Sequence, residues 1–283
     1  MTSPSDITLL DGFERALLNG RLAMAYQPKV ALDDGRLVRV EALVRWDDPK
    51  LGPVAPSRFV PLAERHGLID PLTQWGLRTT LRQWLEWRGR GLDTCIAFNI
   101  SALSLQHLDF PDLVERMCRG LEVPTDRLVL ELTEGATQPL IKLMDTLTRF
   151  RIKGIGLAID DFGTGYSSLM QLRQLPFTDV KIDRLFVNDM CRNRDSMVIV
   201  ETIIRLAHGL GLTATAEGVE TAEQLAVLRD LGCDIVQGYL IAQPLSPGDV
   251  LAWHSRHRRR WKLLVSPPAD QQLRRHIEAN ALR

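Results

Sequence analysis

Polar side chains recur at the ends of short apolar runs along this 283-residue chain. Asn99 follows the run that starts at residue 95, Glu131 lies in the run from 128, and Asp160 and Asp161 end the run from 156. The same position in other runs is taken by Glu41, Lys181, Asp183, Glu217 and Gln237. In α/β barrels, active-site groups lie at the carboxyl ends of the parallel strands. The pattern therefore predicts that these side chains meet at one end of a barrel.

If these side chains lie together, they place a large negative charge in one pocket. The carboxylates concerned are Glu41, Glu131, Asp160, Asp161 and Glu217. Like charges at short range raise carboxylate pKa values, so this group could not stay ionised unaided. Two divalent cations and the ammonium group of Lys181 would balance the charge. The count therefore favours a site with two metal ions over a site with one.

The kinds of donor atom predict which ions these are. The carboxylates are accompanied by the amide carbonyls of Asn99 and Gln237, and oxygen ligands suit Mg²⁺ or Mn²⁺. No histidine falls among the strand-end residues, and the four cysteines lack the paired spacing of a zinc site. Two such ions about 3.5–4 Å apart can hold a bridging hydroxide and stabilise a phosphodiester under in-line attack. The predicted reaction class is phosphodiester hydrolysis.

Taken one at a time, these residues have simpler explanations. A strand-end acid usually caps a helix or faces water, and the tripeptide Glu41-Ala42-Leu43 carries little information by itself. The segment 160–165 is more informative, because two acids precede glycines that can adopt a positive φ close to a ligand. The recurrence of such residues on seven strands is what favours a common site.

The elements that must position these side chains alternate along the chain. Eight runs rich in β-forming residues begin at residues 25, 37, 95, 128, 156, 179, 213 and 234. Amphipathic helix patterns occupy 72–87, 111–121, 139–150, 196–210 and 222–232. Alternating strands and helices form a mostly parallel sheet, and eight strands close naturally into a barrel. We therefore expect a TIM-like (β/α)8 barrel.

One turn predicts a departure from the regular barrel. The first two runs are joined by Asp33-Asp34-Gly35, a hairpin signal. The second strand is therefore expected to run antiparallel to the first. A GxGxxG motif is missing after the first strand, which disfavours an open dinucleotide-binding sheet.

The charge is distributed unevenly. From Arg256 onward there are eight basic and two acidic residues, so the first 255 residues carry 27 basic and 33 acidic side chains, a net charge of −6. A mildly acidic body does not suggest a groove for duplex nucleic acid. We predict a barrel over residues 1–250 and a basic, helical C-terminal tail over 251–283. That tail could contact a partner, although a solvated final helix is the commoner use of such a pattern.

The apolar segments are too short for a membrane protein. No run approaches the roughly 18 residues that a transmembrane helix needs, and acids stand near the amino terminus where a signal peptide would carry basic residues. These features predict a cytoplasmic location without a transmembrane segment.

The ordered motifs resemble the EAL family of cyclic di-GMP phosphodiesterases, from about Leu9 to Leu245. The matching segments are YQP at 26, EALVRW at 41, FVPLAERHGLI at 59, NIS at 99, ELTE at 131, DDFGTGYSSL at 160, KID at 181, AEGVE at 216 and QGY at 237. The family fold is a barrel with one antiparallel strand, which agrees with the predicted hairpin.

The resemblance implies roles for the strand-end residues. One metal ion would be held by Glu41, Asn99, Glu131 and Asp160, and the second by Asp160, Asp161 and Glu217. Lys181 resembles the lysine that orients or activates the attacking water, with Glu217 as a possible base. Glu134 and Glu220 resemble acids outside the metal ligands, with Glu134 anchoring the loop 161–168, which contains Gly163, Thr164 and Gly165.

The resemblance also implies a substrate and an assembly. The substrate contacts would be Gln27, Leu43, Arg45, Asp183 and Gln237. The forked donors of Arg45 suit a phosphate. Family members open cyclic di-GMP, a bacterial second messenger, to linear 5′-pGpG. They commonly form homodimers whose interface communicates with the loop 161–168.

The sequence is also compatible with three other functions. An intact barrel can bind cyclic di-GMP as a receptor without cutting it. The basic segments near the C-terminus could instead mark an interaction module. A third possibility is another metal-dependent barrel that acts on phosphoesters or enolisable acids.

Overall fold

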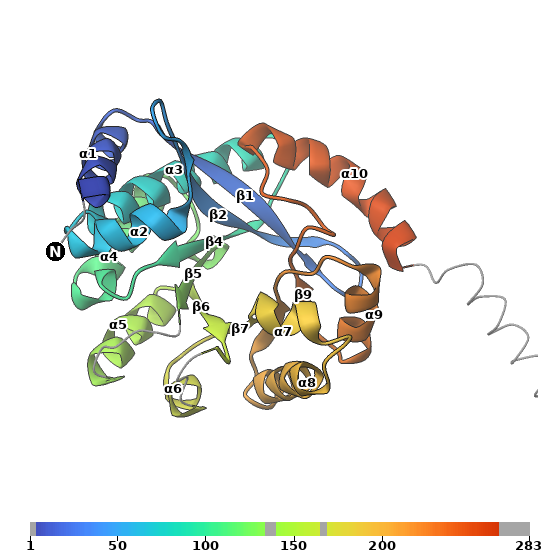
Figure 1. Cartoon of the computed structure of the whole chain (residues 1–283). Coiled ribbons are helices and arrows are strands. Elements are labelled where there is room, and N and C mark those ends of the chain that lie inside the picture. Colours follow the sequence, from blue (N-terminus) through green and yellow to red (C-terminus); the bar gives the residue numbers. More distant parts are fainter. Residues whose placement is uncertain (1–3, 134–139, 165–168, 266–283) are drawn as a thin grey trace, which may run out of the picture.

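The computed structural model describes residues 4–133, 140–164 and 169–265 of the chain. Within these ranges, eight strands form a closed barrel in the order β1-β2-β4-β5-β6-β7-β8-β9, and β9 pairs with β1 to close it. The strands are β1 (Leu22–Ala31), β2 (Leu37–Asp48), β4 (Cys95–Ile100), β5 (Leu128–Thr133), β6 (Gly156–Phe162), β7 (Asp179–Ile182), β8 (Thr213–Ala216) and β9 (Ile235–Val236). A short strand, β3 (Gly52–Val54), pairs with β2 outside the barrel. The predicted α/β barrel is confirmed (Figure 1).

The antiparallel pairing of β1 and β2 is also confirmed, but the inverted strand is the first one. β2 runs parallel to β4, and every later pairing up to β8–β9 is parallel. β1 runs antiparallel to both β2 and β9. A hairpin fixes only the relative direction of its two strands, so the turn alone could not show which of them departs from the rest. Glu41 on β2 therefore approaches the same end of the barrel as the later acids.

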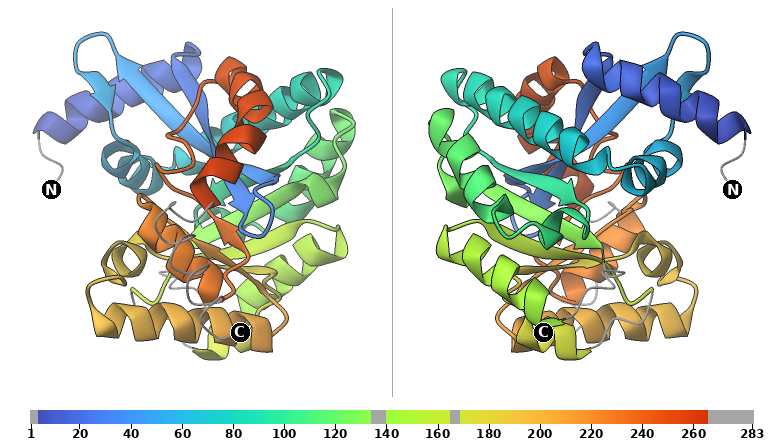
Figure 2. Two further views of the ribbon diagram at one scale, coloured as in Figure 1. Left: turned by 90° about the vertical axis from the view of Figure 1, so that its right-hand side faces the viewer. Right: turned by 90° about the vertical axis from the view of Figure 1, so that its left-hand side faces the viewer.

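Helices surround the barrel, as the two side views in Figure 2 show. Their bounds are α1 (Pro4–Leu18), α2 (Pro56–Arg65), α3 (Ile69–Gly89), α4 (Phe110–Gly120), α5 (Leu140–Ile152), α6 (Leu169–Gln174), α7 (Arg184–Asp189), α8 (Arg194–Gly209), α9 (Ala222–Asp230) and α10 (Pro247–Val265). The five helix patterns of the sequence correspond to α3, α4, α5, α8 and α9. Two 3₁₀ turns lie at Ser104–Gln106 and Thr125–Arg127. None of the described helices is long and apolar enough to cross a bilayer.

Two apolar layers support the barrel. The larger lies between the strands and the surrounding helices and includes the fully buried Trp84 and Trp87 of α3. The indole of Trp84 donates a hydrogen bond to the carbonyl of Thr94 at 2.6 Å. A second cluster joins α1, α2 and β2 through Phe13, Trp46 and Phe59. The interior of the barrel also holds buried polar side chains, among them Glu41, Glu131 and Lys181.

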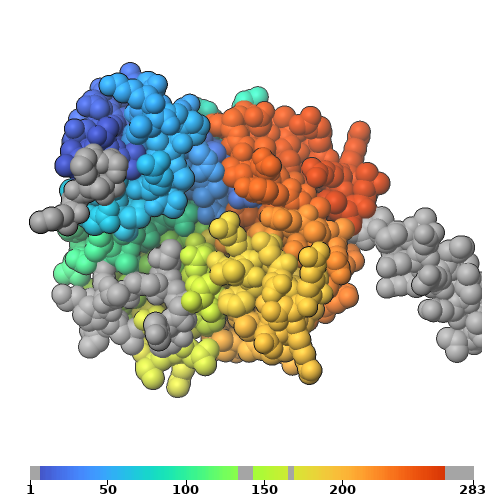
Figure 3. Space-filling view, in the orientation of Figure 1, coloured from blue at the N-terminus to red at the C-terminus, as the bar shows by residue number. Residues whose placement is uncertain are grey.

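Helix α10 packs across the β1–β2 hairpin. The ring of His257 stacks on Trp253 with centroids 4.3 Å apart, and its Nε2 lies 3.0 Å from the carbonyl oxygen of Gly35. Trp261 covers the same glycine. Figure 3 shows the N-terminal segments (blue) meeting the C-terminal segments (red) on one face of the molecule. The helix spans residue 250, where the sequence predicted the tail to start, so that boundary lies inside an element that contacts the barrel.

Candidate functional site

The predicted acids gather inside one end of the barrel because their strands are in matching register. Asn99 pairs with Glu131 across β4 and β5, and Thr133 pairs with Asp160 across β5 and β6. Glu41, Glu131 and Asp160 are buried, with 6%, 1% and 8% of their surfaces exposed. Side chains drawn from distant stretches of the sequence therefore form one buried group.

Lys181 lies at the centre of this group. Its Nζ is 2.7 Å from Glu131 Oε2, 2.8 Å from Asp160 Oδ1 and 2.8 Å from Glu217 Oε1. Burial alone would lower the pKa of Lys181, but the surrounding carboxylates outweigh burial and raise the pKa well above its usual value. The lysine therefore remains a cation that forms ion pairs with all three carboxylates.

An amide network holds Glu41. Asn99 Nδ2 donates to Glu41 Oε1 at 2.7 Å, and Gln237 Nε2 donates to Glu41 Oε2 at 2.9 Å. Gln237 also donates to Gln27 Oε1 at 2.9 Å. Burial raises the pKa of Glu41, but Lys181, Lys29 and these amides together bring it well below the usual range. Glu41 is therefore ionised throughout the neutral range.

One charged member of the group, Lys29, was not predicted from the sequence. Lys29 on β1 is 1% exposed and contacts Glu131 Oε1, with Glu41 Oε2 at 3.2 Å. The signal was present, since Lys29 follows Gln27 by two residues and so faces the same side of the strand. Two lysines against five carboxylates leave a charge of −3. Two divalent ions would then give +1 rather than neutrality, which suits a phosphodiester anion.

Three of the acids could hold a divalent ion together. One carboxylate oxygen from each of Asp160, Asp161 and Glu217 lies within 4.8 Å of the others. Burial raises the pKa of Glu217 to about 8, and burial together with Asp160 raises the pKa of Asp161 to about 7. Excess negative charge of this kind is what a divalent cation relieves. Hard oxygen donors and unbalanced negative charge both fit a divalent metal ion.

The chain after Asp160 bends sharply. Asp161 has a φ of 52°, an uncommon conformation for an aspartate, and Asp161 N donates to Asp160 Oδ1 at 2.8 Å. Gly163 follows with a φ of 99°, and Thr164 Oγ1 donates to the carbonyl of Asp161 at 2.9 Å. The bend turns the Asp161 carboxyl toward Asp183, whose own carboxylate caps α7 through Leu185 N at 2.7 Å. Glu134 and Gly165 lie outside the described residues.

A cleft of about 320 Å³ opens beside Glu41 and Glu217. The predicted substrate contacts Gln27, Leu43, Arg45 and Gln237 line it, and so does Glu220. Two further lining residues, Arg184 and Tyr239, were not predicted, and Tyr239 is 59% exposed. The cleft thus combines cationic, amide and aromatic groups next to the carboxylates.

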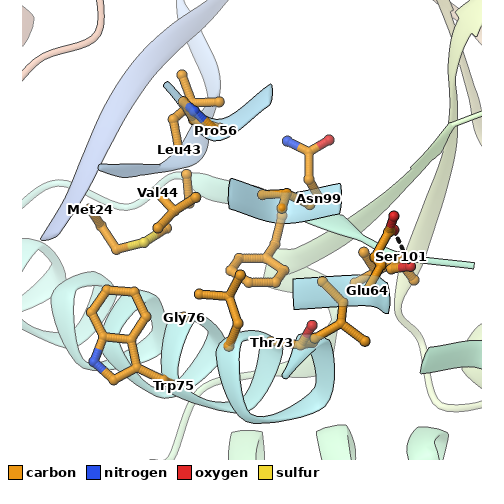
Figure 4. Close-up of a pocket in the computed structure, with 16 residues that line it drawn as sticks. Met24, Leu43, Val44, Pro56, Glu64, Thr73, Trp75, Gly76, Asn99 and Ser101 are labelled. Atoms are coloured by element: carbon orange, nitrogen blue, oxygen red, sulfur yellow. Dashed lines mark hydrogen bonds between the residues drawn. The ribbon is translucent and has the colours of Figure 1, made fainter. Parts of the chain in front are cut away.

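A second, mainly apolar pocket of about 240 Å³ lies between β2, β4, α2 and α3 (Figure 4). Met24, Val44 and Trp75 line it, while Asn99 points away from the helix that forms its floor. At its edge Ser101 donates a hydrogen bond to Glu64 Oε1 at 2.7 Å. This contact joins α2 to the segment that follows Asn99.

Comparisons with known proteins identify a family and several relatives of this chain. The EAL domain family model matches residues 11–244. "Cyclic di-GMP phosphodiesterase PA2567" from Pseudomonas aeruginosa is 39% identical over 234 residues, which cover 82% of this chain and 40% of that protein. "Cyclic di-GMP phosphodiesterase RocR" from the same organism is also 39% identical, over 82% of this chain and 59% of its own length. The chain thus spans 40% of the length of the first relative and 59% of the length of the second.

Solved structures share the fold. The structure described as "PaMucR Phosphodiesterase, c-di-GMP complex" superposes with a TM-score of 0.82 at 39% identity, covering 86% of this chain and 99% of that chain. The EAL enzyme Bd1971 in its "cAMP and cyclic-di-GMP bound form" has a TM-score of 0.84 at 32% identity, over 88% of this chain and 69% of that chain. The family match over most of the sequence and the shared barrel lead to one conclusion: the chain belongs to the EAL domain family.

Proposed function

We propose that this chain hydrolyses cyclic di-GMP to linear 5′-pGpG with two bound divalent cations, Mg²⁺ or Mn²⁺. The observation that carries the proposal is the position of Lys181, within 2.8 Å of Glu131, Asp160 and Glu217 in a buried, acid-rich pocket. The names of the relatives support the choice of substrate, because two of them are called cyclic di-GMP phosphodiesterases.

The residues divide into four roles. Glu41, Asn99, Glu131 and Asp160 would hold one ion, and Asp160, Asp161 and Glu217 the other, with Asp160 shared. When bound, the ions supply a nucleophilic hydroxide and neutralise charge on the phosphodiester. Lys181 keeps its proton and donates hydrogen bonds to the reacting oxygens. Glu217 can accept a proton, since burial makes it more basic than an ordinary glutamate.

The cleft would orient the substrate. Arg45 lies half-buried beside Leu43, and a guanidinium group in this place can make paired hydrogen bonds to a phosphate. Gln27 and Gln237 present amides to the same space, and Gln27 is fixed by its hydrogen bond to the carbonyl of Ala242 at 3.0 Å. These groups would hold the ring of the dinucleotide against the metal site.

The test is turnover of cyclic di-GMP, followed by chromatography of the products with Mg²⁺, Mn²⁺ or chelator. We expect pGpG with either ion and none with chelator. A matched control is available in Lys153, which bridges Asp112 and Glu115 on the outer surface much as Lys181 bridges acids inside. Lys181→Ala should abolish cleavage and Lys153→Ala should not. Tight binding of cyclic di-GMP without cleavage under all conditions would instead identify a receptor.

We also propose that the chain acts as a homodimer. The exposed apolar side chains Leu169 and Met170 on α6 and Leu185 on α7 support this, because apolar surface of this kind favours burial between subunits. Light scattering of the parent chain and of Met170→Asp tests it. A monomeric parent would contradict the dimer without affecting the proposed hydrolysis.

The basic face of α10 is proposed as a contact for an acidic partner. Arg256, Arg258 and Arg259 are exposed there, while Trp253 and Trp261 on the other face pack on the barrel. A chain that ends after Val265 keeps this helix, so we expect its turnover to equal that of the full chain. Loss of folding in this truncated chain would show that residues 266–283 stabilise the barrel.

A further inference from the structure

One buried cation in the floor of the site has no place in the proposed metal coordination. Lys29 extends from β1, the strand that runs against the other seven in the barrel, and only 1% of the residue is exposed. Its Nζ contacts Glu131 Oε1 and lies 3.2 Å from Glu41 Oε2. The lysine therefore joins two proposed ligands of the same metal ion.

The two glutamates come from strands that are not neighbours. Glu41 lies on β2 and Glu131 on β5, with β4 between them. Their other oxygens are engaged elsewhere, because Asn99 donates to Glu41 Oε1 and Lys181 lies 2.7 Å from Glu131 Oε2. Lys29 thus ties the two carboxylates together across the interior of the barrel. Two buried carboxylates without such a cation would repel one another at a large free-energy cost.

We propose that Lys29 is a resident counter-cation of the metal site. It holds Glu41 and Glu131 in place, by contacting one oxygen of each, before a divalent ion arrives. This role rests on the proposed metal site, but Lys29 itself is a positioning residue that need not touch the substrate. It also has a cost: a fixed positive charge beside the ligands opposes the entry of another cation. Lys29 therefore stabilises the metal-free protein and weakens its binding of divalent ions.

The experiment compares the parent with Lys29→Met, which keeps most of the side-chain volume and removes the charge. Thermal melts of chelator-treated protein should show a lower Tm for the variant. Calorimetric titration with Mn²⁺ should show binding about tenfold tighter in the variant than in the parent. The rise in Tm that Mn²⁺ causes should accordingly be larger in the variant.

Two further variants separate charge from packing. Lys29→Arg retains the positive charge, and we expect Mn²⁺ affinity within threefold of the parent. Lys153→Met removes a lysine that also bridges two acids, Asp112 and Glu115, but on the outer surface. It should leave Mn²⁺ affinity unchanged. If either Lys29→Arg or Lys153→Met bound Mn²⁺ more tightly than the parent, the loss of the positive charge at residue 29 could not explain the effect.

Several results would overturn the proposed role of Lys29. Mn²⁺ affinity in Lys29→Met that is weaker than in the parent, or within threefold of it, would overturn the proposal, as would an unchanged metal-free Tm. If Lys29→Met does not fold in chelator, refolding with Mn²⁺ should recover it, and a failure to recover would also overturn the proposal. A parent that binds no Mn²⁺ would instead contradict the proposed function. The metal-free melts would still measure whether Lys29 stabilises the acid cluster.

Discussion

The Nζ of Lys181 lies 2.8 Å from Oε1 of Glu217, and both side chains belong to strands or strand ends that meet inside the barrel. The lysine holds its proton strongly, whereas burial raises the pKa of the glutamate to about 8. A cation and a buried carboxyl group thus stand side by side. This contact supports the proposed roles of Lys181 as a hydrogen-bond donor and of Glu217 as a metal ligand.

Removing the charge of Lys181 should impair catalysis more than it impairs metal binding. We expect Lys181→Met to lower kcat by about 10³-fold, within the usual contribution of a positioned proton donor or electrostatic group. Glu41→Ala should lower both kcat and Mn²⁺ affinity, because it removes a proposed ligand. Rates of pGpG release and calorimetry on the same samples measure the two effects. Equal loss of Mn²⁺ binding in both variants would contradict the separate roles.

Replacing Arg45 should affect substrate binding first. Arg45→Lys keeps a charge but loses the forked donors, so we expect KM for cyclic di-GMP to rise about tenfold with kcat within about threefold of the parent. Steady-state kinetics at saturating Mn²⁺ provide the measurement. A change confined to kcat would place Arg45 at the reacting phosphate in the transition state instead.

Gly35 should be intolerant of a side chain. Its φ is +71°, and an added Cβ would lie 2.1 Å from the Trp261 ring of α10. Gly35→Ala should therefore destabilise the protein by about 3 kcal/mol, from backbone strain together with overpacking. Gly52, with a φ of +68° and open space around it, is the matched control, and Gly52→Ala should cost about 1 kcal/mol. Urea unfolding measures both, and equal costs would show that α10 does not constrain the hairpin.

The docking of α10 should weaken in acid. Burial lowers the pKa of His257 to about 4, compared with roughly 6.5 in an unfolded chain. The unfolded chain therefore binds more protons between these values, and the contribution of neutral His257 to stability is lost as the pH falls from 6.5 through 4. Tm measured over this range should fall less in His257→Gln than in the parent. The same replacement at the exposed His66 should leave the parent's pH dependence unchanged.

Much of the architecture could be predicted because several local signals agreed. The strand runs, the intervening amphipathic helices and the hairpin at Gly35 each indicated one element of a barrel, and the acids at the ends of those runs then indicated the site. Short and proline-containing elements could not be found in this way. Pro61 lies inside α2, where proline ordinarily disfavours a helix, and β3 has only three residues.

The interior of the barrel was harder to predict than its rim. Lys29 is one charge in the apolar run AYQPKVAL, and local sequence does not show that its partners are Glu41 and Glu131 from other strands. The direction of β1 depended in the same way on its pairing with β9, which is distant in sequence. Such features are set by closure of the barrel rather than by local propensity.

In the site that we propose, five carboxylates and Asn99 together hold two divalent ions. The number of Mn²⁺ ions bound per chain, measured by native mass spectrometry after chelator treatment and reloading, tests it most directly. We expect two ions per chain in the parent and fewer in Asp160→Ala, since Asp160 would be shared by both ions. Parent protein that binds one ion or none at saturating Mn²⁺ would contradict the two-metal site.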